Sequence, residues 1–283
     1  MNNGHARVSA GLTSHFMHLL ALSATEIPGG ELRSSALVFS PHPDDECLGC
    51  GGTILKKKQA GATVKIIHLT DGGRSHPPHL ISRQQLSATR AQEALNAGAL
   101  LGVDDVYFLD FPDGALSASV GPATERVAEI IGKEQPAEVF VPYRREPFRQ
   151  AADHLATTHI VFSALRSLRR LGTIRVWEYP VWFWLHWPWV GLEKGLIPRR
   201  YVAINSFSSG LGLAAFRDLR HTVNISDVLE RKIAALSEHR TQMTEFVSSA
   251  EWATLGKVLG GRFLECFYMD REFFCCSGNQ RHG

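Results

Sequence analysis

Cysteine is scarce in this chain of 283 residues, and its few positions follow no regular framework spacing. The five cysteines are Cys47, Cys50, Cys266, Cys275 and Cys276. An odd count without framework spacing argues against a secreted, disulfide-stabilised protein and favours reduced thiols. The sequence therefore predicts a reducing compartment, and we expect the protein in the cytoplasm.

Long apolar runs and a strong net charge are also lacking. The apolar stretch 16–22 is short and is interrupted by His18, so we expect no signal peptide and no membrane span. The formal net charge is only +2, which argues against a dedicated nucleic-acid-binding protein, because such domains are usually strongly basic. An apolar content of 44% in a chain of this length is typical of a globular protein with a sizeable core.

Apolar runs alternate with helical patterns over the first two thirds of the chain. The expected strands cover residues 36–40, 63–69, 106–109, 138–142 and 174–179, and the expected helices cover 51–60, 83–101, 123–134 and 153–170. This alternation predicts an α/β protein with a Rossmann-like, mostly parallel sheet and helices on both faces. Ligands of such folds bind in the crevice at the carboxyl ends of the strands.

The last third of the sequence has a different character. Residues 180–220 are rich in aromatics, glycine and proline, and a further helix follows, for which Asp227 is the expected N-cap and Glu230 its capping-box partner. We find no repeat, low-complexity tract or linker. The sequence therefore predicts a single domain over residues 1–283, with a core at about 34–180 and a C-terminal elaboration at about 181–283.

An unusual cluster of ionisable residues follows the first expected core strand. Residues 40–46 read Ser-Pro-His-Pro-Asp-Asp-Glu, which places His42 beside Asp44 and Asp45 at a strand end. Crowding two carboxylates beside an imidazole costs stability unless a cation offsets the charge. Imidazole nitrogen and carboxylate oxygen are normal zinc ligands, so the segment favours a metal site. The alternative is a simple turn, because Pro-Asp-Asp is good turn sequence.

Asp153 and His154 open the helix that follows the fourth expected strand, where an imidazole could reach the same crevice. Two histidines, one carboxylate and an open position form a known catalytic zinc pattern. An ordinary helix start is the alternative, since an aspartate there favours the helix dipole. Asp71 and Asp113 also follow expected strands, each before a glycine, and either segment could be only a turn.

Three further patterns each allow a structural and a functional interpretation. Cys47 and Cys50 form a C-x-x-C motif, which suggests either a redox pair or, as we favour, two small core residues. Arg144, Arg145 and Arg149 could hold a phosphate or carboxylate of a substrate, although such arginines more often form a solvated face. Residues 56–58 are three consecutive lysines, which we expect on a solvated helix surface.

Five of the six tryptophans lie within residues 177–189. They are Trp177, Trp182, Trp184, Trp187 and Trp189, called the Trp cluster below. Aromatic faces could stack on a sugar, pack in the core, form an oligomer interface or anchor the protein at a membrane surface. We rank core or interface above the sugar platform.

These motifs together resemble the signature of the PIG-L/LmbE-like deacetylases, zinc enzymes that remove N-acetyl groups, mostly from glucosamine conjugates. The resemblance runs over most of the chain, in the expected order. It is carried by Ser40–Glu46, Gly51-Gly52-Thr53, Thr70-Asp71-Gly72, Thr89-Arg90 with Glu93, Asp153-His154 and the segment His239-Arg-Thr-Gln242.

The resemblance implies a role for several individual residues. It implies that His42, Asp45 and His154 bind zinc, or another divalent metal, and that Asp44 is the general base. It also implies a substrate site lined by Arg90 and Asp113, to which we add Arg149 as a candidate.

The sequence departs from the family pattern at one position. Ala151 stands where many members carry a histidine that stabilises the oxyanion. We expect His239, Tyr143 or Arg149 to take this role, with His239 as the catalytic candidate; otherwise activity is low or absent.

The resulting prediction is a zinc-dependent hydrolase that removes an N-acetyl or N-acyl group from a small-molecule aminosugar conjugate, with no nucleic-acid partner. One alternative is a catalytically weak or silent sugar- or metal-binding protein of the same fold. Another is a thiol oxidoreductase using Cys47 and Cys50. A membrane-surface enzyme held by the Trp cluster, and a homo-oligomer, are further alternatives.

Overall fold

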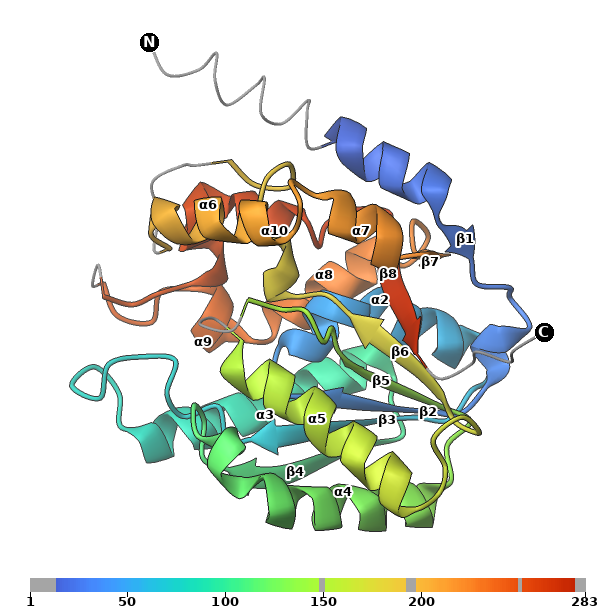
Figure 1. Ribbon diagram of the computed structural model, residues 1–283. Helices are drawn as coiled ribbons and strands as arrows, with labels where there is room; N and C mark the ends of the chain where they lie inside the picture. The colour runs from blue at the N-terminus through green and yellow to red at the C-terminus, as the bar shows by residue number, and fades with distance from the viewer. Residues whose placement is uncertain (1–13, 148–150, 192–196, 249–250, 278–283) are drawn as a thin grey trace.

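The computed structural model describes residues 14–147, 151–191, 197–248 and 251–277 (Figure 1). Its sheet has eight strands in the order β1-β7-β8-β6-β5-β2-β3-β4. The strands are β1 (Thr25–Glu26), β2 (Ala36–Ser40), β3 (Val64–Thr70), β4 (Asp105–Phe111), β5 (Glu138–Pro142), β6 (Arg175–Tyr179), β7 (His221–Asn224) and β8 (Arg271–Ser277). Only β8 runs antiparallel to its neighbours β6 and β7, so the predicted mostly parallel sheet is confirmed.

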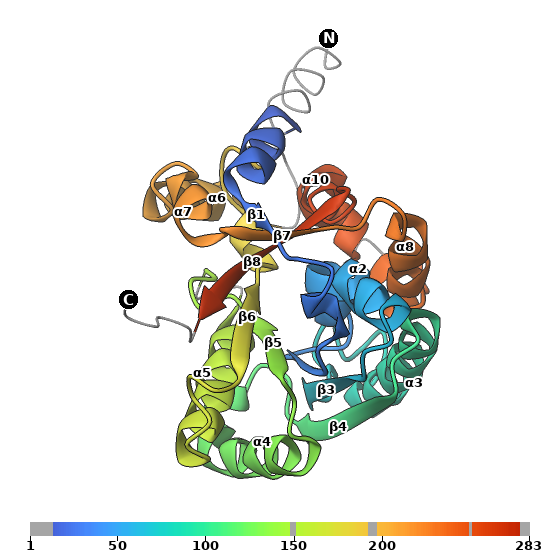
Figure 2. The ribbon, with the colours of Figure 1, turned by 90° about the vertical axis from the view of Figure 1, so that its right-hand side faces the viewer.

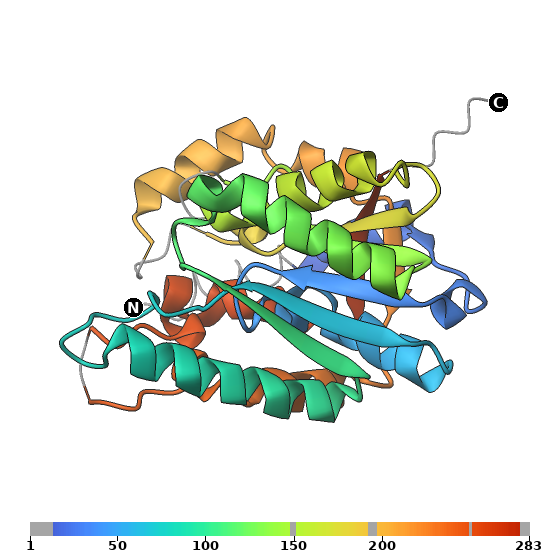
Figure 3. The same cartoon turned by 90° about the horizontal axis from the view of Figure 1, so that it is seen from below.

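Helices cover both faces of this sheet, as predicted (Figure 3). The α-helices include α2 (Asp45–Gln59), α3 (Arg83–Leu101), α4 (Val120–Glu134), α5 (Ala152–Ser167), α6 (Arg199–Ser208), α7 (Leu213–Asp218), α8 (Leu229–Ser237), α9 (Arg240–Met243) and α10 (Arg262–Glu265). Residues 14–23 are also helical. The 3-10 helices are η1 (Glu31–Arg33), η2 (Leu116–Ser119), η3 (Trp182–Trp184) and η4 (Leu255–Gly261). Helices α4 and α5 cover one face, and α2, α3 and α8 cover the other (Figure 2).

The two faces of the sheet bury separate apolar cores because successive strand residues point to opposite sides. On β2, Leu37 and Phe39 belong to the cluster under α4 and α5, whereas Ala36 and Val38 belong to the cluster under α2. All five residues of β2 are buried. Strand β2 ends at residue 40, and the polar segment that follows it emerges at the carboxyl edge of the sheet.

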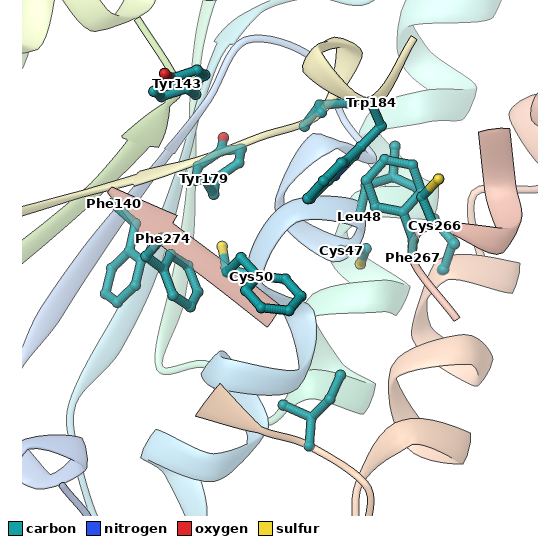
Figure 4. Close-up of a cluster of buried hydrophobic side chains, with 14 of the residues drawn as sticks. Cys47, Leu48, Cys50, Phe140, Tyr143, Tyr179, Trp184, Cys266, Phe267 and Phe274 are labelled. Atoms are coloured by element: carbon teal, nitrogen blue, oxygen red, sulfur yellow. The ribbon is translucent and has the colours of Figure 1, made fainter. Parts of the chain in front are cut away.

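The second core is rich in aromatic side chains, most of them from β6 and the residues that follow it. Figure 4 shows Tyr179, Trp184 and Phe274 beside Cys47 and Cys50 of α2. A β-carbon on Gly49 would lie 2.1 Å from the Tyr179 ring, so the glycine permits this close approach of helix and strand. The C-x-x-C motif is thus part of a packed helix, which agrees with the core interpretation of both cysteines.

Most of the Trp cluster also packs in the core. Trp177, Trp184 and Trp189 are buried, and Trp182 stacks on Phe263 with ring centroids 4.9 Å apart. The core interpretation is therefore confirmed for these residues, and buried rings cannot form a membrane anchor or a sugar platform. Trp187 is 39% exposed and is the member left at the surface.

Two local predictions are wrong. Lys57 is not solvated: it is buried, and its Nζ lies 2.6 Å from Glu138 Oε2 on β5. The N-cap of α8 is Val228 and makes no side-chain cap; Asp227 pairs instead with Lys56. The capping box forms on α3, where Ser82 accepts a hydrogen bond from the Gln85 backbone N–H.

The C-terminal region extends the sheet of the core. Strands β7 and β8 join the edge at β6, and β1 adds to β7 (Figure 2). No helix among the described residues is long and apolar enough to cross a membrane.

Candidate metal centre

The side chains of His42, Asp45 and His154 meet at the carboxyl edge of the sheet. Asp45 Oδ2 lies 3.1 Å from His42 Nδ1 and 3.2 Å from His154 Nε2. The two imidazole centroids are 5.5 Å apart, and one ligand atom from each residue falls within 4.8 Å of the others. The structure thus brings together the three residues for which we predicted metal binding.

The pairing of β2 with β5 explains why these distant residues meet. The two strands are parallel neighbours, so their carboxyl ends lie side by side. His42 follows β2 and Asp45 begins α2, whereas His154 lies in the first turn of α5, after β5. The three metal-binding candidates therefore come from the carboxyl ends of two neighbouring strands and the helices that follow them.

The electrostatics of this group fit a divalent cation. Burial alone lowers the pKa of His154, but Asp45 and Glu146 outweigh burial and raise the pKa to about 9. Burial likewise lowers the pKa of His42, but hydrogen bonds with Asp113, Asp153 and Asp45 raise it well above its ordinary value. The surrounding carboxylates thus favour positive charge at both imidazoles, and a bound metal would compete with protons for the same nitrogens.

Unsatisfied nitrogens support the same conclusion. Neither ring nitrogen of the fully buried His154 makes a hydrogen bond of acceptable geometry: Nδ1 lies 3.0 Å from Glu146 Oε2, and Nε2 lies 3.2 Å from Asp45 Oδ2. Buried polar atoms without partners are costly, and most native proteins avoid them. A cation held between the imidazole and the Asp45 carboxylate would give Nε2 its partner, so the donor set fits the metal that the family resemblance implies.

Three further carboxylates contact the outer nitrogens of the two histidines. His42 Nε2 lies 3.3 Å from Asp113 Oδ1 and 3.3 Å from Asp153 Oδ2, while His154 Nδ1 lies 3.0 Å from Glu146 Oε2. Such contacts fix the tautomer and orientation of metal-binding histidines. The structure places Asp113 against His42, and its expected place in the substrate site stays a prediction. Neither Glu146 nor Asp153 was predicted as a site residue, and only the adjacency of Asp153 to His154 gave a signal.

Asp44 lies beside the three metal-binding candidates in a constrained conformation. Its φ is +130°, a region that residues other than glycine rarely adopt, and its side chain is buried. Burial is the largest influence on its carboxyl and raises its pKa to about 7, although Arg90 opposes this rise. A carboxyl group with a pKa near neutrality is suited to accept and return a proton.

Arg90 holds the loops around Asp44. The guanidinium is buried: Nη1 donates to the carbonyl of Gly72 at 2.9 Å, and Nη2 donates to that of Pro43 at 2.5 Å. Its Nη2 also lies 3.3 Å from Asp44 Oδ2. These contacts make Arg90 an anchor for the segment that carries Asp44, and its expected place in the substrate site stays a prediction.

His239 lies behind Glu46 in the structure. It is fully buried, and its Nε2 is 3.1 Å from Glu46 Oε1. Glu46 Oε2 in turn accepts from the Asp44 backbone N–H and from the Ser40 hydroxyl, both at 3.1 Å. Within the described ranges, no contact links His239 to the three metal-binding candidates. This geometry favours a positioning role for His239 over the catalytic role that we expected.

None of the candidates that the structure describes evidently replaces the oxyanion-stabilising histidine that is absent at Ala151. Ala151 is buried at the N-cap of α5. The Tyr143 hydroxyl is engaged with Asp218 Oδ2 at 2.5 Å, and His239 is bound to Glu46. Arg149, which we expected to bind substrate or replace the missing histidine, lies outside the described residues.

The remaining candidates have structural partners. Burial raises the pKa of both Cys47 and Cys50 well above the ordinary thiol value, and neither side chain is exposed. Reactive cysteines are thiolates in accessible, electropositive sites, so this environment opposes a redox pair. Arg144 pairs with Glu178, and Arg145 Nη1 lies 3.3 Å from Asp218 Oδ2.

Comparison with known proteins shows which family this chain resembles. Residues 37–165, which include all three metal-binding candidates, match the family described as PIG-L: GlcNAc-PI de-N-acetylase. The resemblance that we noted from the sequence is therefore confirmed over this segment.

Two relatives show which activities are known for similar chains. Diacetylchitobiose deacetylase of Thermococcus kodakarensis is 28% identical over 216 residues, which cover 75% of this chain and 71% of the relative. The 1D-myo-inositol 2-acetamido-2-deoxy-alpha-D-glucopyranoside deacetylase of Mycobacterium sp. (strain KMS) is 26% identical over 242 residues, 76% of each chain. Both relatives are named as deacetylases of acetylated aminosugars.

Solved structures confirm the fold. N,N'-diacetylchitobiose deacetylase from Pyrococcus horikoshii matches with a TM-score of 0.60 at 23% identity, over 87% of this chain and 84% of that one. GalB, the 4-carboxy-2-hydroxymuconate hydratase from Pseudomonas putida KT2440, matches with a TM-score of 0.58 at 16% identity, over 88% and 98%. Because a hydratase shares the architecture, the fold alone does not decide the reaction.

Proposed function

We propose that this protein is a metal-dependent N-deacetylase that acts on a small aminosugar conjugate. The observation that carries the proposal is the convergence of His42, Asp45 and His154 beside the buried carboxyl of Asp44. The relatives named as aminosugar deacetylases support the substrate class. Zinc is the metal that this nitrogen and oxygen donor set favours, and another divalent ion is the alternative.

In this proposal His42, Asp45 and His154 hold the metal, and the residues around them prepare the site. When bound, zinc supplies Lewis-acid chemistry, polarising the acyl carbonyl and lowering the pKa of water. Asp44 takes the proton of the attacking water and returns it to the leaving amine. Arg90 and Glu46 hold Asp44 in place, Asp113 and Asp153 orient His42, and Glu146 orients His154.

The test is the Asp44→Asn variant, assayed for zinc content and for release of acetate from N-acetylglucosaminides. We expect the variant to bind zinc with parental stoichiometry and to lose most of its turnover, roughly 100-fold or more, because general base catalysis typically contributes that much. Asp110→Asn is the matched control, since Asp110 is exposed, and its left-handed backbone also suits asparagine. Parental turnover in Asp44→Asn would refute the assignment of the base.

A catalytically weak or silent metal-binding protein is the second candidate, and Ala151 is the observation that favours it. Oxyanion donors are worth on the order of 10² to 10³ in rate, so a site that lacks one would turn over slowly. Stoichiometric zinc without acetate release from any acetylated aminosugar would support this candidate over the first.

We also propose that residues 1–283 act as one domain, because β7 and β8 extend the sheet of the core. A cytoplasmic location, suggested by the unpaired cysteines, stays a prediction, as does a homo-oligomer. Membrane-surface contact through the Trp cluster would rest on Trp187, since its buried neighbours cannot provide it.

A further inference from the structure

Exposed apolar side chains are concentrated on helices α6 and α7. Twelve large apolar side chains are exposed among the described residues, and four of them fall within residues 204–213. The four are Ile204, Phe207, Leu211 and Leu213, with 59%, 78%, 51% and 70% of their surface exposed. Single exposed apolar residues are normal, whereas a group of them rimmed by polar residues marks an interaction surface for a protein or a membrane.

The four residues are neighbours along a short stretch of helix, turn and helix. Helices α6 and α7 lie at one side of the molecule, outside the sheet (Figure 2). Ile204 and Phe207 are three residues apart on α6, which places them on one face of the helix. A tight turn joins α6 to α7: the Gly210 N–H donates to the Phe207 carbonyl at 3.0 Å, and the Leu213 N–H donates to the Gly210 carbonyl at 3.2 Å. Leu211 and Leu213 therefore follow directly on the end of α6 that carries Phe207.

The backbone of this turn is costly at Leu211. Its φ is +54°, and those of Gly210 and Gly212 on either side are +59° and +89°. This left-handed region favours glycine over leucine. The chain thus accepts an unfavourable conformation at a residue whose apolar side chain stays exposed, and such outliers cluster at functional positions.

Trp187 extends this apolar group. Its backbone N–H donates to Ser206 Oγ of α6 at 2.9 Å, and its side chain is 39% exposed. We call the five residues the α6–α7 patch: Trp187, Ile204, Phe207, Leu211 and Leu213.

The charges around the patch are basic. Residues 197–220 contain four arginines and a single acid, Asp218, so their formal net charge is +3. The whole chain carries only +2, which leaves a net charge of −1 for all other residues together. Arg200 lies four residues before Ile204 on α6, and Arg217 lies four residues after Leu213 on α7. Basic side chains therefore flank the apolar ones on both helices.

Most of these arginines have no acidic partner. Within the described ranges, no carboxylate pairs with Arg199, Arg200 or Arg220, whereas Arg217 pairs with Asp218. A second copy of the chain bound across a two-fold axis would place the same basic surface against itself, and such like-charge contact disfavours binding. An anionic surface instead pairs with the arginines, and the protruding apolar side chains between them can enter a lipid layer.

We propose that the α6–α7 patch docks on the surface of an anionic lipid bilayer. Phe207, Leu211 and Leu213 enter the boundary between headgroups and acyl chains, while the flanking arginines bind lipid phosphates. Trp187 lies at the level of the headgroups, where tryptophan is enriched. The inference goes beyond the proposed deacetylase function and does not depend on it, because no residue of the metal centre takes part.

The first experiment measures binding to vesicles. The purified chain is sedimented with sucrose-loaded vesicles of phosphatidylcholine, with or without phosphatidylglycerol. We expect binding to the anionic vesicles to be at least tenfold tighter, because each basic residue near an anionic surface favours binding roughly fivefold. Added salt should weaken this binding, since it screens exposed charges. Equal binding to the two kinds of vesicle, or binding to neither, would overturn the inference and leave the deacetylase proposal untouched.

Two variants locate the binding, and each has a matched control on α3, which lies on the opposite side of the molecule (Figure 2). Phe207→Ser should weaken binding to anionic vesicles about tenfold, because it removes apolar surface that the bilayer buries. Arg200→Gln should weaken it roughly fivefold. The controls Leu95→Ser and Arg83→Gln make the same kinds of change at exposed positions and should bind as the parent does. Equal losses in variants and controls would overturn the inference; unfolding midpoints show that each variant is folded.

Sedimentation velocity without lipid tests whether a second copy covers the patch. We expect the parent and Phe207→Ser to have the same oligomeric state. A parental oligomer that Phe207→Ser dissociates would identify the patch as a contact between copies of this chain and would overturn the inference.

Discussion

Replacement of His239 tests whether this residue positions the site or takes part in the chemistry. His239 and Glu46 form a buried pair, and the Glu46 carboxylate also receives the Asp44 N–H. His239→Ala removes one partner and leaves the carboxylate buried without its imidazole donor. Breaking a buried charged pair typically costs about 3–5 kcal/mol, because the remaining charge keeps its desolvation penalty.

This cost should be visible in thermal unfolding. For a chain of this size, a loss of about 3 kcal/mol lowers the midpoint by roughly 6–12 °C. The pKa of Glu46, which burial raises but His68 and His239 lower to about 2 overall, should also rise in the variant. We expect kcat to fall as well, because the carboxylate that fixes the constrained Asp44 backbone loses its anchor.

His239→Gln is the matched variant, since its amide can still donate a hydrogen bond to Glu46 but cannot transfer protons. If His239 is a positioning residue, glutamine should restore at least half of the lost stability and much of the activity. Stability is measured by calorimetry, and activity by kcat/KM for an N-acetylglucosaminide. If His239→Gln is as stable as the parent but inactive, His239 is catalytic and our reasoning from the geometry is refuted.

Two other residues give independent predictions. Burial lowers the pKa of His186 to about 4, from an ordinary value of 6.5, so between these values the unfolded chain binds more protons than the folded chain. Neutral His186 therefore contributes up to about 3 kcal/mol to the free energy of unfolding. This contribution is complete above about pH 6.5 and is lost as the pH falls through 4. Denaturation in urea across this range should show a shallower decline in His186→Asn, and an unchanged slope would contradict the prediction. Separately, Glu146→Gln removes the charge behind His154 and should weaken zinc binding about 10- to 100-fold in competition with a chelator; parental affinity would show that Glu146 does not support the metal.

The sequence determined much of the central sheet, because local pattern controls those elements. Residues 36–40 and 138–142 form strands with the predicted bounds, and 83–101 forms the predicted helix. A fully buried strand must be apolar throughout, and a change to polar residues marks its end. The proximity of His42 and His154 also followed, since the carboxyl ends of parallel strands share one edge of the sheet.

Only the tertiary structure decided the elements and partners that depend on distant parts of the chain. Strand β8 was not predicted, and its two halves pair with different strands: Arg271–Phe274 with β7 and Cys275–Ser277 with β6. Lys57 is buried because Glu138 lies opposite it. Glu146 gave no local signal for its contact with His154. The segment around His239 was recognised from the sequence, but its pairing with Glu46, 193 residues away, was set by the packing. A local pattern reports which face of an element is buried, whereas the partner of a buried charge is set by the packing of whole elements.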